Sequence, residues 1–154
     1  MTNLSHGRSL DYRVALGGTR EGDLQAYRVH IMQDAGAYPA IGSVLPMFGR
    51  IMASGNYALD RVDASGESVV TNTTPVGAYR GAGRPEATLA LERIIDVYAA
   101  EIGMDPAELR RMNFLGKDDF PYVTQTGADM DTGDYEAALD KVLEIVDVDA
   151  LRAE

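Results

Sequence analysis

The chain has 154 residues, of which 45% are apolar and 25% charged, and its formal net charge is −10 at pH 7. This length suits one globular domain, and the negative charge disfavours a nucleic-acid partner. Because the chain has no cysteine, it cannot hold a disulfide framework, a thiolate metal site or a cysteine-bound iron–sulfur cluster. No apolar run is long enough to cross a membrane and no secretory signal is visible, so we expect a cytoplasmic location.

The first part of the chain has the period of β-strands. Apolar side chains alternate with polar ones along residues 10–16, and the alternation returns along residues 24–33. The polar residues 19–23 between them form a turn signal, so the two stretches predict a β-hairpin. A glycine-containing loop is expected at residues 34–39.

The next segment gives a weaker signal. Residues 43–54 are ambiguous, because a proline and a glycine interrupt a helical pattern. Residues 57–62 and 67–71 predict two further strands around a turn at residues 64–66, which read Ala-Ser-Gly.

After Pro85 the apolar residues take a helical period. The stripe consists of Leu91, Ile94, Ile95, Tyr98 and Ile102, widened by Ala87, Ala90, Val97 and Ala100. Such a wide stripe predicts that most of this helix is buried. Gly103 is expected to end it.

Two more helix starts follow. Asp105 is a capping residue, followed by a first-turn proline and by an acid at Glu108, so a short helix is predicted through Arg111. A longer helix is predicted to start near residues 132–134, and another near residue 149. The expected apolar side of the longer helix carries Tyr135, Ala138, Leu139, Val142, Leu143 and Val146.

The candidate ligand site is the glycine-rich stretch 76–86, which reads VGAYRGAGRPE. Glycines allow a ligand to approach the backbone, and a helix start offers unpaired N–H groups and partial positive charge. Anionic or oxygen-rich groups suit such a place. Arg80 and Arg84 beside this positive end predict a negative group nearby, either a ligand oxygen or a carboxylate, for which Glu86 is the nearest candidate.

The spacing of this stretch does not match two common phosphate-binding motifs. No Gly-Lys-Ser/Thr follows, as a Walker loop requires, and Arg84, Pro85 and Glu86 spoil a dinucleotide fingerprint. Judged by spacing alone, a glycine-rich turn entering a helix is more often structural, because close packing of helix on sheet also favours glycine.

The motif continues into the helix as GAYRGAGRPEATLALERIIDVYAAEIGMDPAELRRMNF. Over that length it resembles the large subunit of the molybdenum hydroxylases, the xanthine dehydrogenase, aldehyde oxidase and carbon monoxide dehydrogenase family. Residues 33–39 (QDAGAYP), 125–127 (QTG) and 131–135 (DTGDY) are similar to the same family. The resemblance therefore covers nearly the whole chain.

This resemblance implies a chemistry for the intact family enzyme. Such an enzyme hydroxylates a carbon centre, or in one branch oxidises carbon monoxide, at a molybdenum ion held by a pterin dithiolene. We expect molybdopterin in its cytosine dinucleotide form as the cofactor of the parent enzyme. The expected partners are the remaining large-subunit segments together with iron–sulfur and FAD subunits, which carry the electrons away.

The chain is expected to be a segment of such a subunit. It begins directly at the predicted hairpin and ends where a helix starts. No upstream glycine-rich stretch supplies the family's glutamine near the metal, and no downstream Gly-Glu motif supplies its catalytic glutamate. We therefore predict a chain that is inactive alone, with no catalytic residue, no metal ligand and no bound cofactor of its own.

In the family, the matching loop passes beside the molybdenum centre and shapes the substrate pocket. The resemblance thus implies cofactor-binding roles for Ala78, Tyr79, Arg80, Gly81, Ala82 and Gly83. Arg80 would supply the positive charge, and the two glycines the close backbone approach. Ala82 marks the position where relatives can place a larger pocket side chain. Tyr79 is expected to pack behind the loop.

Two positions bear on the substrate. In the carbon monoxide branch the residue after the arginine is a copper-binding cysteine, whereas this chain has Gly81, so we expect an organic substrate such as an aldehyde or an N-heterocycle. Arg84 departs from the small glycine common in xanthine-oxidising relatives, and their substrate preference is therefore not assumed.

Other notable side chains have simpler interpretations. The adjacent Arg110 and Arg111 are typical of an exposed helix face. His6 and His30 have no ligand-like neighbours in the sequence, so no metal role is expected for them. The acids of residues 129–134 lack a complete calcium-binding loop and are expected to cap a helix.

Three hypotheses follow from the sequence. The first, which we favour, is the molybdenum hydroxylase segment. The second is a small phosphate- or nucleotide-binding module, and the third is a structural interaction piece. The predicted fold is α+β: a single domain over residues 1–154, mainly strands over 1–75, a glycine loop over 76–84 and mainly helices over 85–154. The sheet is expected to be hairpin-rich, mixed or antiparallel, with the helices packed on it, and to belong to a larger molybdopterin-binding domain. If the sheet leaves part of the apolar helix uncovered, the chain is expected to form a homo-oligomer or to need the missing subunit parts.

Overall fold

The computed structural model describes residues 5–153. The predicted β-hairpin is confirmed at the start of the chain. Strand β1 (Leu10–Gly18) pairs antiparallel with β2 (Leu24–Gly36), with a register irregularity at the end of β1. β2 runs three residues further than predicted, into the expected loop. It does so because a third strand pairs with it there, Asp34 opposite Val69 and Gly36 opposite Val70.

The third strand, β3 (Arg61–Val70), is continuous and runs parallel to β2. The prediction of two strands around a turn at residues 64–66 is therefore wrong. Gly66 pairs with Ile31 inside the ladder. A Cβ on Gly66 would lie 2.9 Å from Cβ of Pro46, so this glycine permits close packing of a helix and does not form a turn. The sheet is thus mixed, in the order β1-β2-β3.

The ambiguous segment between β2 and β3 is helical. A 3₁₀ turn, η1 (Ile41–Val44), leads into the helix α1 (Leu45–Ile51). Pro46 does not break this helix, because it lies in the first turn, where its missing N–H has no partner to lose. The helix is favoured here because its apolar side chains pack on the sheet beside Gly66.

The long helix is confirmed as α2 (Arg84–Ile102), with Gly103 in the left-handed conformation at its end. A smaller part of the surface of α2 is buried than predicted. One face, with Ala87, Leu91, Ile95 and Ala99, is fully buried, whereas Val97 and Ala100 are exposed. The three-stranded sheet covers only one face of a helix, so the rest of the wide apolar stripe stays half-buried or open.

The remaining elements extend from the end of α2. Helix α3 (Pro106–Asn113) is capped by Asp105, whose side chain accepts hydrogen bonds from the Ala107 and Glu108 N–H groups. The connection after it holds a turn, η2 (Lys117–Asp119), and a small unpredicted hairpin, β4 (Tyr122–Val123) with β5 (Asp129–Met130). Helices α4 (Tyr135–Val146) and α5 (Val148–Ala153) follow, and Asp134 caps α4 as expected for that acidic stretch.

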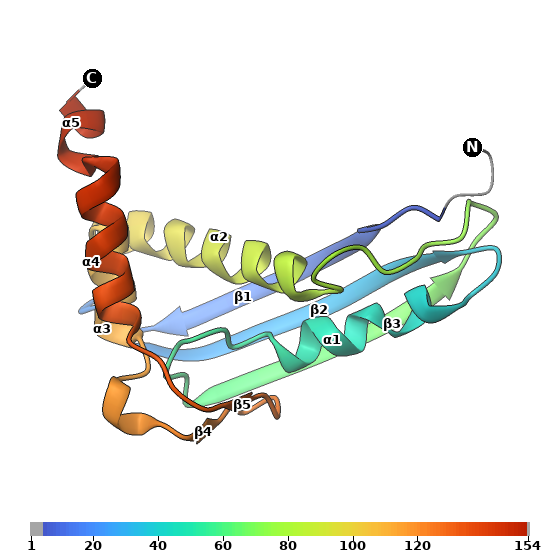
Figure 1. The fold of residues 1–154 in the computed structure, drawn as a ribbon, viewed down its shortest axis with the longest axis horizontal. Helices are drawn as coiled ribbons and strands as arrows, with labels where there is room; N and C mark the ends of the chain where they lie inside the picture. The colour runs from blue at the N-terminus through green and yellow to red at the C-terminus, as the bar shows by residue number, and fades with distance from the viewer. Residues whose placement is uncertain (1–4, 154) are drawn as a thin grey trace.

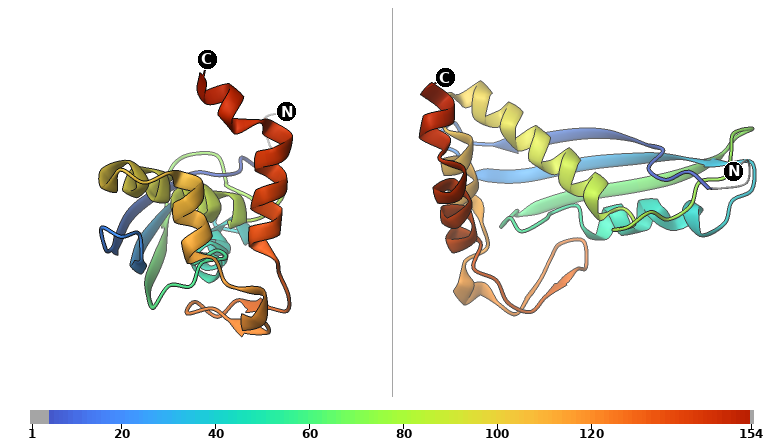
Figure 2. Two further views of the ribbon diagram at one scale, coloured as in Figure 1. Left: turned by 90° about the vertical axis from the view of Figure 1, so that its left-hand side faces the viewer. Right: turned by 45° about the horizontal axis from the view of Figure 1, so that its top comes forward.

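The elements form two layers. Helices α1 and α2 lie side by side on one face of the sheet, and the opposite face is solvated and polar (Figures 1 and 2). Helix α4 does not pack on the sheet as predicted. It stands at one end of the molecule against α3, and no residue of α4 is buried (Figure 1). The core lies between the sheet and α2; its largest members include Leu24, Ile31, Tyr57, Leu91, Ile95 and Leu109.

No helix within residues 5–153 is long and apolar enough to cross a membrane.

Candidate functional site

The glycine loop connects β3 to α2, as the sequence indicated, and its backbone is unusual. Gly81, Ala82 and Gly83 have φ values of 96°, 42° and 92°, so three successive residues adopt the left-handed conformation. Only glycine enters this region freely, and Ala82 is held in it by the hydrogen bond from its N–H to the Tyr79 carbonyl, at 2.8 Å. The loop therefore has one defined, sharply turning path into the helix.

The six predicted residues are exposed to different extents. Ala78, Tyr79 and Arg80 are exposed, the next two residues are half-buried and Gly83 is buried at the N-cap of α2. Within the described residues, the N–H groups of Gly81 and Gly83 have no hydrogen-bond partner. The structure thus brings unpaired donors and a helix N-terminus together beside an exposed arginine.

Glu86 does not neutralise the loop arginines, contrary to expectation. Its carboxylate pairs instead with Arg8, Nε to Oε1 at 3.6 Å. In residues 5–153 neither Arg80 nor Arg84 forms an ion pair. Within the described residues, Arg80 and Arg84 therefore carry positive charge without an ion-pair partner, which favours an anionic ligand at this end of α2.

Tyr79 does not pack behind the loop. The residue is 63% exposed, and its ring lies under the guanidinium of Arg8, whose Cζ is 4.8 Å from the ring centroid. Sequence reasoning missed Arg8, because it is more than 70 residues away along the chain and stands in no motif. The only signal was its position just before the first strand.

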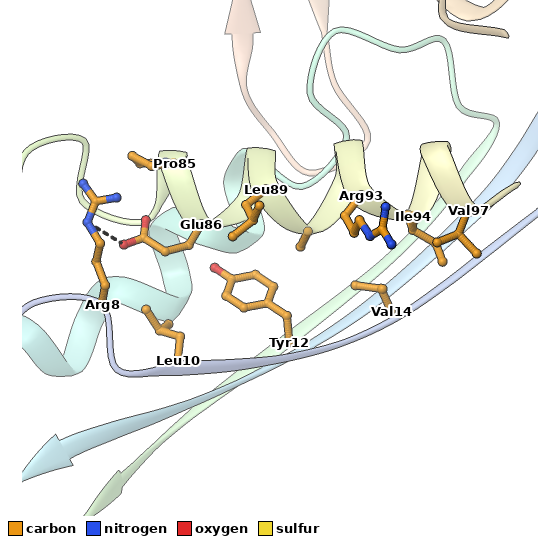
Figure 3. Close-up of a pocket in the computed structure, with 11 residues that line it drawn as sticks. Arg8, Leu10, Tyr12, Val14, Pro85, Glu86, Leu89, Arg93, Ile94 and Val97 are labelled. Carbon is orange, nitrogen blue, oxygen red and sulfur yellow. Dashed lines mark ion pairs between the residues drawn. The ribbon is translucent and has the colours of Figure 1, made fainter. Parts of the chain in front are cut away.

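A groove of about 440 Å³ adjoins the loop between β1 and α2 (Figure 3). Its walls are mostly apolar, with Leu10, Val14, Leu89 and Val97, and the ion pair of Arg8 with Glu86 closes its loop end. Its lining does not include Arg80 or Arg84. The groove therefore neighbours the loop without forming a pocket around its charges.

Two buried polar atoms in this groove lack a partner in the described structure. These atoms are the Tyr12 hydroxyl oxygen and Oε2 of Glu86. Burial, with a smaller contribution from the Glu86 charge, raises the pKa of Tyr12 to about 12, so its hydroxyl stays protonated at neutral pH. The groove thus offers the Tyr12 hydroxyl and Oε2 of Glu86 as unpaired polar atoms on a mostly apolar lining, which also includes the charged Arg8 and Arg93.

Of the other singled-out side chains, Arg110 is placed differently from the prediction. It is not on an exposed face, because Nε donates to Glu92 and Nη2 to Asp96, each at 2.8 Å, and its side chain is only 17% exposed. The Tyr57 hydroxyl donates to the same Glu92 carboxylate. This network joins α2 to α3 and is structural.

The two histidines lie in different parts of the fold: His6 forms a β-bridge with Val76, and His30 lies on β2. His30 contacts the Ser65 hydroxyl at 3.0 Å and Glu67 at 3.3 Å on the polar face of the sheet. No group of three potential ligand side chains within residues 5–153 could hold a metal ion.

The comparisons with known proteins point to one family. The molybdopterin cofactor-binding domain family matches residues 1–114. The carbon monoxide dehydrogenase large chain of Hydrogenophaga pseudoflava is 41% identical over 143 residues, covering 90% of this chain and 18% of that protein. The 6-hydroxypseudooxynicotine dehydrogenase complex subunit gamma of Paenarthrobacter nicotinovorans is 39% identical over 125 residues, covering 79% of this chain and 16% of that one.

A solved structure supports the same assignment. Quinoline 2-oxidoreductase from Pseudomonas putida 86 superposes with a TM-score of 0.89 at 29% identity, covering 97% of this chain and 19% of that chain. This chain therefore spans less than a fifth of the length of these relatives. It belongs to the molybdopterin-binding large-subunit family of the molybdenum hydroxylases, and it corresponds to a part of that subunit.

Proposed function

We propose that this chain is the segment of a molybdopterin-dependent oxidoreductase whose loop 78–83 lies against the cofactor. One observation carries the proposal: within the described residues, the exposed Arg80 has no ion pair and stands beside unpaired N–H groups at the start of α2. Molybdopterin in its cytosine dinucleotide form is anionic, so this donor set fits it. When bound, that group supplies the molybdenum centre at which substrate is oxidised.

Within the parent enzyme, the residues of this chain would position the cofactor and would not take part in the chemical reaction. Arg80 would hold an anionic group, and the N–H groups of Gly81 and Gly83 would donate hydrogen bonds to an oxygen of the ligand. We propose an aldehyde or an N-heterocycle as the substrate class. Quinoline 2-oxidoreductase and 6-hydroxypseudooxynicotine dehydrogenase are similar proteins named for N-heterocyclic or related organic compounds. Gly81, at the position where the resemblance places the copper-binding cysteine of the carbon monoxide branch, argues against a thiolate-bound copper there, despite the similarity to carbon monoxide dehydrogenase.

We propose that residues 1–154 form a single domain that lacks the catalytic glutamate of the family and is inactive alone. The remaining large-subunit segments, an iron–sulfur subunit and an FAD subunit would complete the enzyme in the cytoplasm. The exposure of residues 78–80 supports this, since these residues leave one side of the loop open to a covering group.

The test is Arg80→Ala in the assembled enzyme, compared with Arg61→Ala, an exposed arginine on β3. Removing one preorganised donor typically costs about 10²–10³-fold in kcat. We expect a loss of that order, or a loss of bound molybdenum and pterin, for Arg80→Ala alone. Equal cofactor content and turnover in both variants would contradict the proposal. Tight phosphate or nucleotide binding by the isolated chain would favour the small binding module instead.

A further inference from the structure

Arg8 contacts three separate parts of the loop and its helix. Its Nη2 donates to the Arg80 carbonyl oxygen at 2.9 Å, and its guanidinium carbon lies 4.8 Å from the Tyr79 ring centroid. Its Nε lies 3.6 Å from Oε1 of Glu86, in the first turn of α2. A planar guanidinium can make these contacts together because its donors point in fixed directions and its face can stack on a ring.

The backbone around Arg8 holds it in this place. The His6 N–H donates to the Pro75 carbonyl at 3.2 Å, and the Gly77 N–H donates to the His6 carbonyl at 2.7 Å. Arg8 itself has a φ of 63°, which a residue with a side chain rarely adopts. Such a conformation persists only where the surroundings hold it. The segment before β1 therefore runs alongside the segment before the loop and aims Arg8 at it.

The hydrogen bond from Arg8 to the Arg80 carbonyl lies at the point where the loop enters its left-handed conformation. The Arg80 carbonyl belongs to the peptide that links Arg80 to Gly81, which is the first of the three left-handed residues. A hydrogen bond from a charged donor to this oxygen fixes the orientation of that peptide plane. It thereby fixes the Gly81 N–H and the point from which the Arg80 side chain leaves the backbone.

We infer that Arg8 is a positioning residue, which locks the glycine loop in the conformation that presents Arg80 and the Gly81 N–H to the ligand. The part of this inference that concerns a ligand rests on the proposed function. The effect of Arg8 on the conformation of the loop does not depend on that function. The role of Arg8 is exerted through the Arg80 peptide, the Tyr79 ring and Glu86.

Amide hydrogen exchange in the full chain measures the locking directly. The loop has two protected amides, Ala82 bonded to the Tyr79 carbonyl and Arg84 bonded to the Gly81 carbonyl. Because hydrogen bonds to charged groups are stronger than neutral ones, Arg8→Ala is expected to speed exchange at these amides roughly tenfold. Exchange at the core amides of α2 should not change. Arg13→Ala is the matched control, an exposed arginine on β1 whose partner is Asp11.

Two further variants keep the test sharp if Arg8→Ala folds poorly. Arg8→Lys keeps the charge but loses the planar fork, so its loop exchange should lie between those of the unchanged chain and Arg8→Ala. Glu86→Gln removes the ion pair and leaves the Arg80 carbonyl contact, so a smaller change is expected. Unchanged loop exchange in all three variants would overturn the inference, as would equal acceleration throughout α2.

The assembled enzyme separates this inference from the proposed function. Arg8→Ala is expected to lower kcat about tenfold while leaving KM within twofold, and Arg8→Lys to restore part of the rate. If Arg8→Ala frees the loop but Arg80→Ala leaves cofactor content and turnover intact, the locking stands and the proposed function falls. If Arg80→Ala abolishes turnover while Arg8→Ala changes neither loop exchange nor kcat, the proposed function stands and the locking falls.

Discussion

Asn113 is a buried amide whose polar atoms all have partners. Its Oδ1 accepts from the Leu24 N–H at 2.9 Å, and its Nδ2 donates to the carbonyls of Gly22 and Leu109 at 2.8 and 2.7 Å. It thus ties the hairpin turn to the last turn of α3. Its position at the end of a short helix gave no sequence signal for this role.

Replacing Asn113 by Ala should lower the free energy of unfolding by about 2–4 kcal/mol, because several buried groups lose their partners at once. Urea denaturation of Asn113→Ala, with the exposed Asn72→Ala as control, measures the difference. A loss of unfolding free energy no larger than that of Asn72→Ala would contradict the role of Asn113 in joining the hairpin turn to α3.

Asp34 is a second residue whose side chain forms several hydrogen bonds. Its carboxylate accepts hydrogen bonds from the Thr71 hydroxyl at 2.6 Å, the Gly36 N–H at 2.8 Å and the Thr73 hydroxyl at 2.9 Å. These bonds, chiefly that of Thr71, hold the pKa of Asp34 below the ordinary value of 3.8. The carboxylate anchors the chain between β3 and the glycine loop.

The lowered pKa fixes the sign of a pH dependence. A carboxyl with a lower pKa in the folded state stabilises the protein above its unfolded-state pKa, and this stabilisation is lost as pH falls through the folded-state pKa. Asp34→Asn should therefore be less stable than the unchanged chain at pH 7, with a difference that shrinks below about pH 4. Unfolding measured from pH 7 to pH 3, with the exposed Asp60→Asn as control, tests this. A constant difference would contradict it.

At the scale of elements, the two ends of α2 differ although both carry a left-handed glycine. At Gly83 a Cβ would lie 2.9 Å from the Gly49 N atom and 3.0 Å from the Leu45 carbonyl oxygen, both in α1. At Gly103 a Cβ would meet nothing within 4 Å. The first glycine therefore serves both conformation and helix packing, and the second only conformation.

This difference predicts unequal effects of the same substitution. Gly103→Ala should cost about 1–2 kcal/mol for the left-handed backbone alone. Gly83→Ala should cost more, about 3 kcal/mol or above, because α1 must also move. Thermal or urea unfolding of the two variants gives the comparison, and equal costs would show that α1 and α2 are not tightly packed there.

In the molecule as a whole, one of the two edge strands of the described sheet, β1, lies next to the mostly apolar groove. β1 pairs only with β2 in the described structure, and Leu89 and Val97 beside the groove are 72% and 46% exposed. An unpaired edge beside apolar side chains favours association with another chain. The net charge of −10 opposes association of two copies, and salt screens that repulsion.

We therefore expect the isolated chain to self-associate at physiological salt. The double variant Leu89→Glu with Val97→Glu should shift it toward monomer in sedimentation experiments and reduce binding of an apolar dye. Val123→Glu, an exposed apolar position on β4, is the control and should leave association unchanged. A monodisperse monomer without dye binding would contradict the prediction.

The hairpin, the long helix α2 and the starts of α3 and α4 could be predicted from the sequence alone. The period-2 alternation gave the hairpin, and the period of 3.6 with Asp105, Asp134 and Gly103 gave the helices and their ends. These signals are readable because they act within a few residues. The glycine loop and the family could be identified for the same reason, since their residues are contiguous.

The contacts between distant segments could not be predicted from the sequence, because they depend on how the chain folds. The parallel pairing of β3 with β2, the helical state of residues 45–51 and the limited burial of α2 depend on which surfaces meet. So does the contact of Arg8 with the Arg80 carbonyl, across 72 positions of sequence. Such contacts leave no local pattern, because their energy is gained only after the chain has brought the two segments together.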